Sequence, residues 1–412
     1  MNKLGILFVA DSLEIIGGAE VSTRDQIHLL SKKGAKISFL TSGNSKSSGV
    51  DEIDIYKNKY KGFFFKKSSN NFLRNYRGLF NLKALFAMKR AISFFKPNVI
   101  IFNNISGQAS YSSILYAKFK GINTVHILRD TMSLTGGKFF YSKTKDIYKI
   151  NYFDEIKRAR LRFNPFKTFF TKYCLNRTDV LISISYELKR FFNYNGITID
   201  QVIHNGVIEQ TSDESYLNQH SKPSKKSIFW PSRYSKFKGG HQIIKAFNLI
   251  DDGNIDLIIT ADKKDIKDKE VLDIIDRSNN IYFTGWISKE DINGYMLKAD
   301  LILYPSLYLE PFGRVPVEAM SFKKPVIVSN YGGLPEIIKH GYNGYVVDPF
   351  NLNDFSEKIK KIIYDEKLKR DIGINGYKEY KNSFTGDKMI NEYYNMLINL
   401  VTENESNSTH HI

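Results

Sequence analysis

The segment YPSLYLEPFGRVPVEAMSFKKPVIVSNYGGLPEIIKHGYNGYVV, residues 304–347, follows a short apolar run that begins at Leu301. Such a run is typical of a strand buried in a parallel sheet. Pro305 and Pro311 prevent a strand or helix from continuing, so a loop must follow. Pro316 is tolerated in the first turn of a helix, which is therefore expected to begin near Arg314. The pattern predicts strand, loop and helix in an α/β fold.

Two carboxylates bracket this turn, with Glu310 on the loop and Glu318 on the expected helix. A carboxylate can accept two hydrogen bonds at once, which suits the vicinal hydroxyls of a ribose or a pyranose. The free N–H groups at a helix N-terminus suit a phosphate. We therefore expect a sugar nucleotide here. The alternative is that both glutamates lie on the surface without a ligand, as most glutamates do.

The pattern E-P-F-G-R-V-P-V-E-A-M, then K-P-V-I-V-S, G-G-x-P-E-I-I and G-x-N-G-Y, closely resembles family 4 of the retaining glycosyltransferases with its Glu-x7-Glu signature. The match runs without a gap through the quoted segment. The resemblance implies an α/β fold of the GT-B type, with two Rossmann-like domains facing each other across a cleft. It also implies sugar transfer from a nucleotide diphosphate with retention at the anomeric carbon.

A second motif, RYSKFKGG at residues 233–240, begins the second half of the chain. Arg233, Lys238 and the paired glycines before a helix would direct two cations and several N–H groups to one point, as a diphosphate requires. The family's Arg-x4-Lys-Gly element matches Arg233 and Lys238. Trp286, which follows Gly285, resembles the family's turn near the nucleotide base.

The resemblance assigns roles to these residues. Arg233 and Lys238 would stabilise the charge on the departing phosphate, and that phosphate would take the acceptor proton. Glu310 would hold sugar hydroxyls and Glu318 the ribose. The remaining donor-binding residues would come from the loop and the helix start: Pro311, Phe312, Gly313, Arg314 and Val315.

The first half of the chain is expected to add residues from another sheet. Gly17 and Gly18 separate a first strand at 4–10 from a helix at 19–33, and they resemble the family's glycine-rich loop at the donor. His126 lies near the carboxyl end of a strand at 123–128, the edge where ligands bind in open α/β sheets. By resemblance His126 is a catalytic residue beside the donor sugar. The alternative is a structural histidine.

A chain of 412 residues is too long for one ordinary core, so two domains are expected. We predict an N-terminal acceptor domain and a C-terminal nucleotide-sugar domain, then a helix that crosses back to the first domain and a polar tail. The predicted limits are 1–205 for the first domain, 206–226 for the linker, 227–385 for the second domain, 386–401 for the helix and 402–412 for the tail.

The net charge of +17 is unevenly distributed. Residues 1–200 hold 33 Lys and Arg against 14 Asp and Glu, a balance of +19, and the remainder carries −2. Segments 59–96 and 157–173 mix Phe, Tyr and Leu with Lys and Arg. Such segments fit an anionic membrane surface, where each cation contributes about 1 kcal/mol. The alternative is that their apolar residues pack into the core and the cations face water.

For segment 59–96 we expect a combination of the two readings. A helix would bury Leu79, Leu82 and Phe86, while residues 63–67 would stay outside.

Several classes of protein lack support in the sequence. The single cysteine, Cys174, excludes an internal disulfide and indicates a reducing compartment. The first residues read as a strand rather than a signal peptide, and no segment reaches the roughly 20 apolar residues that span a bilayer. Neither G-x-G-x-x-G after the first strand nor G-x4-G-K-[ST] is present. Asp-x-Asp is absent too, so we expect no metal and no cofactor.

The sequence thus predicts a retaining hexosyltransferase using a UDP- or GDP-linked sugar and a glycan or lipid-linked acceptor of bacterial surface glycan synthesis: O-antigen, capsule or lipopolysaccharide. It should be cytoplasmic and peripheral on the inner face of the plasma membrane, and no nucleic-acid partner is expected. One alternative is a basic nucleic-acid-binding protein, suggested by the pI near 9.4. Others are a nucleotide-sugar-binding protein without turnover and a sugar phosphorylase.

Overall fold

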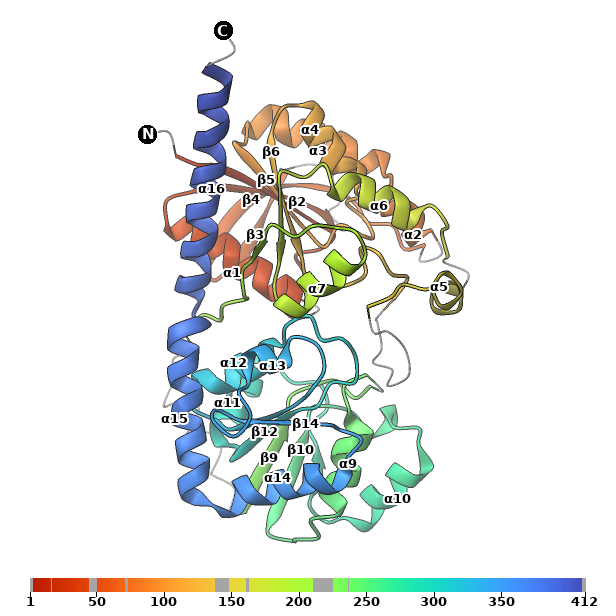
Figure 1. Ribbon diagram of the computed structural model, residues 1–412, viewed down its shortest axis with the longest axis vertical. Helices are drawn as coiled ribbons and strands as arrows, with labels where there is room; N and C mark the ends of the chain where they lie inside the picture. Colours follow the sequence, from red (N-terminus) through yellow and green to blue (C-terminus); the bar gives the residue numbers. More distant parts are fainter. Residues whose placement is uncertain are drawn as a thin grey trace. The chain divides into compact units, whose positions relative to one another are not determined.

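The computed structural model describes residues 3–15, 17–43, 50–70, 73–137, 148–160, 163–209, 225–235 and 237–409. These residues form two compact units, shown in Figure 1. Unit 1 holds the described residues up to 137, those of 148–206 and those from 386 onward, and unit 2 holds those from 207 to 385. Most of the predicted linker, residues 210–224, lies outside the described residues.

Unit 1 is built on a sheet with the strand order β3-β4-β2-β1-β5-β6-β7-β8. Every neighbouring pair is parallel except β3 and β4. The central strands are buried continuous apolar runs, as parallel strands covered on both faces require. The strands are β1 (Gly5–Ala10), β2 (Lys36–Gly43), β3 (Val50–Ile55), β4 (Asn58–Lys66), β5 (Val99–Asn103), β6 (Asn123–Leu128), β7 (Val180–Ser183) and β8 (Gln201–Val202).

Helices connect these strands and flank the sheet (Figure 1). They are α1 (Gly18–Lys32), α2 (Arg74–Arg77), α3 (Leu82–Phe95), α4 (Ser112–Phe119), α5 (Tyr152–Ala159), α6 (Lys167–Leu175) and α7 (Tyr186–Tyr194). Cys174 of α6 is fully buried, as expected for a small apolar residue.

The expectation for segment 59–96 was wrong for Leu82, Phe86 and Phe63, although Lys66 is exposed as expected. Phe63 is 5 % exposed because β4 pairs with β2 and lies inside the sheet, whereas Leu82 and Phe86 are 58 % and 66 % exposed. Helix α3 packs on β4 and β2 through small residues such as Ala84 and Ala87. Helical spacing alone could not tell which side of α3 faces the sheet.

The last helix, α16 (Gly386–Thr409), belongs to unit 1 and packs against α1, with the Lys33 ammonium 5.8 Å from the Tyr394 ring centre. The prediction that the helix ends at 401 and a polar tail follows was wrong, because the helix continues through Thr409. Residues 402–409 contain neither glycine nor proline, so nothing in the chain stops the helix at 401.

Unit 2 has a parallel sheet with the strand order β11-β10-β9-β12-β13-β14. Its strands are β9 (Lys226–Trp230), β10 (Ile255–Ile259), β11 (Ile281–Phe283), β12 (Leu301–Tyr304), β13 (Val326–Ser329) and β14 (Tyr345–Val347). Its helices are α9 (Gly240–Asn248), the 3-10 turn η2 (Lys263–Asp265), α10 (Lys269–Arg277), α11 (Lys289–Lys298), α12 (Arg314–Ser321), α13 (Leu334–Ile337), α14 (Leu352–Tyr364) and α15 (Glu366–Ser383). The predicted strand ending at Tyr304 and the helix beginning at Arg314 are confirmed.

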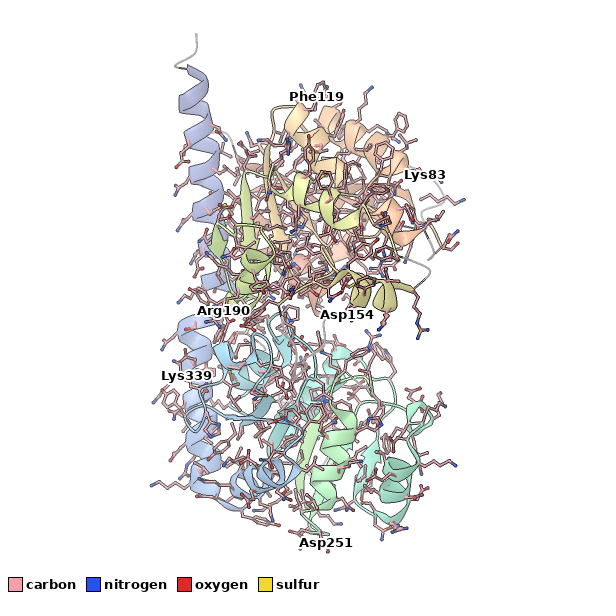
Figure 2. All side chains as sticks on the ribbon, turned by 45° about the vertical axis from the view of Figure 1, so that its right-hand side comes forward. Lys83, Phe119, Asp154, Arg190, Asp251 and Lys339 are labelled. Carbon is pink, nitrogen blue, oxygen red and sulfur yellow. The ribbon has the colours of Figure 1, made fainter. Side chains whose placement is uncertain are left out.

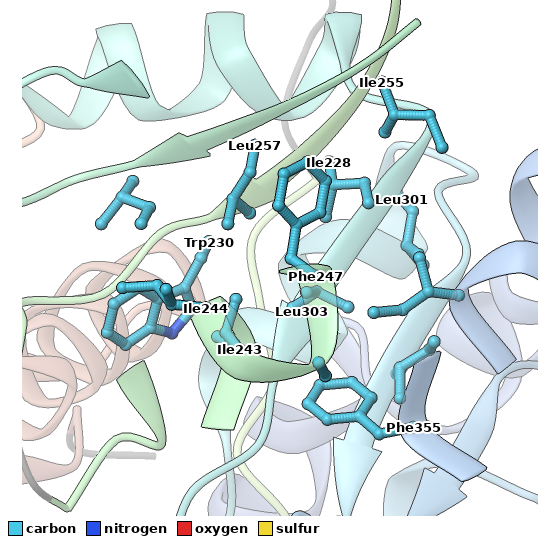
Figure 3. Packing of buried hydrophobic residues seen from close by; sticks show 14 of the residues in the cluster. Ile228, Trp230, Ile243, Ile244, Phe247, Ile255, Leu257, Leu301, Leu303 and Phe355 are labelled. Atoms are coloured by element: carbon cyan, nitrogen blue, oxygen red, sulfur yellow. The ribbon is translucent and has the colours of Figure 1, made fainter. Parts of the chain in front are cut away.

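The core of unit 2 lies between its sheet and helices α9 and α14 (Figure 3). Trp230 of β9 and Leu303 of β12 contribute to it from the sheet, and Ile243, Phe247 and Phe355 from the helices. These side chains are 5 % exposed or less, so the strands that carry the site loops are firmly anchored. Within the described ranges, no helix has the length and apolar character needed to span a bilayer.

Candidate donor-binding site

The candidate site is built from loops that follow two neighbouring strands of unit 2. Strands β9 and β12 are paired in parallel, so their carboxyl ends meet at one edge of the sheet. The loop of Arg233 and Lys238 follows β9, and the loop of Glu310 follows β12. The two loops are joined where Leu307 N–H donates to the Phe237 carbonyl at 2.8 Å. This is the sheet edge at which α/β folds bind ligands.

Lys238 and Glu310 form a buried ion pair at this edge. The Lys238 Nζ lies 2.9 Å from Glu310 Oε2, with side-chain exposures of 18 % and 9 %. Lys238 also donates to the hydroxyls of Tyr304 at 2.7 Å and Tyr308 at 3.2 Å. Tyr304 and Ser306 donate to Glu310 Oε2 at 3.2 and 2.8 Å. The bonds that Glu310 accepts from Lys238, Tyr304 and Ser306 all end on Oε2. A carboxylate has about four lone-pair sites, so Glu310 can accept further hydrogen bonds.

The surroundings keep this pair ionised. Burial alone would raise the pKa of Glu310, but the Lys238 charge and the hydrogen bonds from Lys238 and Ser306 outweigh it and lower the pKa. Burial alone would lower the pKa of Lys238, but the Glu310 charge raises it well above its usual value. Burial, followed by the Glu310 charge, raises the pKa of Tyr304 to about 12. The tyrosines therefore stay neutral hydrogen-bonding groups around a charged pair.

Two glycine positions explain how the loops come so close. Gly239 caps α9 with a φ of 76°, and a Cβ there would lie 2.1 Å from the Pro305 carbonyl oxygen. Gly332 has a φ of 68°, and a Cβ there would lie 2.3 Å from the Glu310 backbone. Larger residues would move the chain that carries Lys238 or Glu310. The Gly239–Gly240 pair of the sequence motif therefore serves loop packing as well as the start of a helix.

Glu318 lies on α12 and is held by two cations. Its Oε1 accepts from Arg314 Nε at 2.9 Å, and its Oε2 lies 2.7 Å from Lys289 Nζ. Burial would raise the pKa of Glu318, but the charges of Lys289 and Arg314 outweigh it and lower the pKa. Sequence reasoning missed Lys289, which begins α11 in the turn after Trp286. Its nearness to that turn was the only available signal.

The loop between the two glutamates has one structural anchor and ends at the start of a helix. Phe312 is 2 % exposed and packs edge-on against Phe384, with ring centres 6.0 Å apart. Gly313 caps α12 with a φ of 100°. Pro311 and Val315 are partly exposed on either side. Helix α12 therefore begins a few residues after Glu310, and the positive end of its dipole can meet an anion.

Arg233 and Trp286 form a separate, exposed part of the site. The Arg233 guanidinium carbon lies 5.4 Å from the Trp286 ring centre, a cation–π distance. Trp286 is 78 % exposed, an unusual placement for a large aromatic side chain. Its free ring face can stack on a planar base.

The residues predicted from the first half of the chain lie in unit 1. His126 is 2 % exposed in β6, stacked between Phe102 and Tyr111 with ring centres 6.2 and 5.9 Å away. Burial lowers its pKa to about 3, so its ring is neutral. This placement is that of a core residue, and it gives no support to the predicted contact with the donor sugar.

Gly17 and Gly18 are exposed at the start of α1. Gly17 has extended dihedral angles, and a Cβ there would meet only Glu20 Oε2, at 3.5 Å. The turn itself therefore does not require glycine at this position. The predicted approach of this loop to a donor stays a prediction.

Among the described residues, no cluster of three or more His, Cys, Asp and Glu side chains is arranged to hold a metal ion. The positive charges of the candidate site come from Lys238, Arg233, Lys289 and Arg314. Metal independence stays a prediction.

Comparison with known proteins gives the family. The family model described as Glycosyltransferase Family 4 matches residues 16–210, and the model described as Glycosyl transferases group 1 matches residues 212–379.

Two curated relatives each match about half of this chain. An uncharacterized glycosyltransferase of Methanocaldococcus jannaschii is 31 % identical over 54 % of this chain and 60 % of its own length. The capsular polysaccharide biosynthesis glycosyltransferase CapM of Staphylococcus aureus is 27 % identical over 43 % of this chain and 47 % of its own length. The matched stretches thus span about half the length of these relatives.

Among solved structures, HepE of Anabaena in complex with UDP-glucose is similar over 96 % of this chain and all of that one. The TM-score is 0.70 at 20 % identity, a likeness that shows the fold. Two parallel α/β units, the Glu310–Glu318 spacing and two family models that together reach from residue 16 to 379 agree: the chain belongs to the family 4 glycosyltransferases and has the GT-B fold.

Proposed function

We propose that this protein transfers a hexose from a UDP- or GDP-linked donor to a hydroxyl group, with retention of the anomeric configuration. The observation that carries the proposal is the buried Lys238–Glu310 pair beside the N-terminus of α12. It joins a cation for phosphate, a carboxylate for sugar hydroxyls and the start of a helix at one sheet edge. The similarity of the fold to HepE in complex with UDP-glucose supports this choice of donor.

Each group of the site has a task in this proposal. Lys238 and Arg233 stabilise the charge that develops on the leaving diphosphate, because fixed cations in a site of low polarity act strongly there. Glu310 orients the sugar through its hydroxyls, and Glu318, held by Lys289 and Arg314, accepts from the ribose. Trp286 stacks on the base. The leaving phosphate takes the proton of the acceptor hydroxyl, so no protein base is needed at that step.

The proposed acceptor is a glycan or lipid-linked glycan of bacterial surface polysaccharide synthesis, reached at the inner face of the plasma membrane. Two observations favour it. The excess positive charge lies in residues 1–200, which suits an anionic partner. The similarity to a glycosyltransferase of capsular polysaccharide biosynthesis points to the same class.

Nucleotide binding can be tested by fluorescence. The chain has two tryptophans, Trp230 in the core of unit 2 and the exposed Trp286. Titration of the Trp230→Phe variant with UDP or GDP should quench the emission of Trp286 saturably. Absence of quenching and of heat in calorimetry with both nucleotides would overturn the proposal.

Turnover can be tested with a panel of nucleotide sugars by following nucleotide release and, by NMR, the anomeric configuration of the product. Lys238→Ala and Glu310→Ala should each lower the rate by at least about a hundredfold, as removal of one charge-stabilising group does elsewhere. Lys367→Ala and Glu357→Ala, on exposed helix positions of the same unit, should keep the rate. Addition of EDTA should not change it.

The basic pI also allows a nucleic-acid-binding protein. An RNA gel shift beside the UDP titration separates the two functions. A protein that binds nucleotide sugars without releasing the nucleotide would instead be a non-catalytic binder.

A further inference from the structure

We propose that unit 1 docks on an anionic lipid bilayer through the outer faces of α3 and α6. We define this docking face by the apolar residues Leu82, Phe86, Phe166, Phe169 and Tyr173 and by Lys83 and Lys89. The inference rests on the proposed function for the identity of the acceptor. It adds to that function the surface of unit 1 that would reach a membrane. Vesicle binding itself can be measured without any donor.

Helix α3 buries mainly small apolar residues and exposes larger ones. It buries Ala84, Ala87, Met88 and Ala91 against the sheet. Its large apolar residues Leu82, Phe86 and Phe94 are 58 %, 66 % and 77 % exposed. Residues 82, 86, 89, 90 and 93 follow helical spacing, so the exposed residues form one face. Large apolar side chains gathered on one exposed face mark a candidate interaction surface.

Helix α6 shows a similar pattern. Lys167 is 5 % exposed and donates to the carbonyls of Met132 and Thr135 at 2.8 and 2.7 Å. By contrast, Phe166 and Phe169 are 69 % and 74 % exposed. Tyr173 continues this exposed face, with the Arg177 guanidinium 3.5 Å over its ring. The Lys167 side chain is thus buried, while the aromatic side chains are exposed to water, where their apolar surface is unfavourable.

An open, mostly apolar hollow of about 420 Å³ lies between α2 and the segments that lead into α3 and α6. Leu79 and Phe80, which lead into α3, line it from one side, and Phe166, which leads into α6, from the other. Leu73, Tyr76, Arg77 and Asn164 also line it, and the Tyr76 hydroxyl reaches the Phe163 carbonyl. The hollow can receive a lipid chain from the surface that the flanking aromatics enter.

The charge around this face selects the partner. Between Asp54 and Asp130 the sequence contains no aspartate or glutamate, and Lys83 and Lys89 are exposed on α3 between its apolar residues. Figure 2 shows Lys83 and Phe119 projecting outward from unit 1. A second copy of the chain would bring the same lysines against each other, which is repulsive in a two-fold dimer. An anionic bilayer offers both a negative surface and an apolar interior.

The test is flotation of the full chain with vesicles of phosphatidylglycerol and, separately, of phosphatidylcholine. We expect binding to phosphatidylglycerol vesicles that weakens as salt rises, because exposed charges are screened within about 10 Å at 0.1 M. Phosphatidylcholine vesicles should bind much less. If the chain does not float with phosphatidylglycerol at low salt, the proposal fails.

Matched variants locate the binding. Lys83→Gln with Lys89→Gln should lower the partition coefficient about fivefold for each lysine, and Phe86→Gln with Phe169→Gln should also weaken binding. The controls, Lys367→Gln with Lys378→Gln and Phe350→Gln, change exposed residues of unit 2 and should bind like the wild type. Equal losses in the controls would show that net charge or general stickiness, and not this face, binds lipid.

Two further measurements separate the remaining outcomes. Light scattering should show the same mass for the wild type and for Phe86→Gln with Phe169→Gln. A wild-type dimer that this variant dissociates would assign the face to a second copy and overturn the proposal. UDP titration should be unchanged in all these variants, so a chain that floats but binds no nucleotide would refute the proposed function alone.

Discussion

Lys238 illustrates how one residue can serve stability and chemistry together. Its ammonium group and the Glu310 carboxylate are both largely buried and 2.9 Å apart. Breaking a buried pair by removing one partner leaves an uncompensated charge, which is more costly than never having the pair. The alanine variants that test catalysis must therefore be compared with variants that test folding.

We expect Lys238→Met to lower the free energy of unfolding by about 3 kcal/mol at neutral pH, because Glu310 then stays buried without its cation. The double variant Lys238→Met with Glu310→Gln should recover most of this loss. Urea unfolding monitored by tryptophan emission measures both. A double variant as unstable as the single one would contradict the account of the ion pair.

The same pair predicts how stability depends on pH. The folded pKa of Glu310 and that of Glu318 are lowered, so their contribution to the free energy of unfolding is complete above the usual carboxyl pKa of 4.5. It is lost as the pH falls through the lowered folded values. The folded pKa of Lys238 is raised, so its contribution is complete below 10.5 and is lost at higher pH. Urea titrations of Glu310→Gln should show a shallower acid limb than those of the wild type.

Trp286 gives a prediction about affinity rather than stability. The side chain is exposed, so Trp286→Ala should leave the unfolding midpoint unchanged. Stacking of a base on an aromatic ring contributes about 1–3 kcal/mol, so the Kd for UDP should rise about 5- to 100-fold. Calorimetric titration measures it. An unchanged Kd would place the base elsewhere.

Among larger elements, the start of α9 sets the position of Lys238. Gly239→Ala should displace this loop, because a Cβ would meet the Pro305 carbonyl at 2.1 Å. Gly341 is the matched control: its φ of 79° is close to the 76° of Gly239, but a Cβ there has open space around it. Both variants carry similar backbone strain. We expect only Gly239→Ala to weaken UDP binding, and equal effects would refute the role of the Pro305 contact.

The elements also show where sequence reasoning succeeds. Strand β12 and helix α12 were predictable because two prolines and a glycine leave the chain few alternatives between Tyr304 and Arg314. The orientation of α3 was not predictable, because alanines and phenylalanines both count as apolar and only the space beside β4 decides between them. Lys289 was missed for a related reason. A lysine after a serine cap looks like an ordinary surface residue until the fold brings Glu318 to it.

Across the whole molecule, the two units have separate sheets and both tryptophans lie in unit 2. Tryptophan emission therefore reports the unfolding of unit 2, while far-UV circular dichroism reports both units. A ligand that binds only the folded form raises stability by mass action. UDP at a hundred times its Kd should stabilise the emission transition by about 2.7 kcal/mol. If UDP shifted the dichroism but not the emission, the nucleotide site would not be in unit 2.

Membership of the family and the class of fold could be predicted from the sequence, because segment 304–347 is rich in prolines, glycines and glutamates at fixed spacing. The burial of His126 could not be predicted. The sequence around a histidine in a strand is the same whether its ring contacts a ligand or two aromatic neighbours. That distinction depends on Phe102 and Tyr111, which lie far from it in sequence. Pattern identifies which residues form a strand, and packing identifies what each side chain touches.

The Lys238–Glu310 pair has one further consequence. The resting site already supplies its cation with an oxygen anion, so a nucleotide diphosphate would arrive by exchange with a carboxylate that stays nearby. Free inorganic phosphate would have to make the same exchange without the contacts of base, ribose and sugar. The Glu310 carboxylate thus competes with phosphate for Lys238, which would keep the site from binding the common phosphates around it.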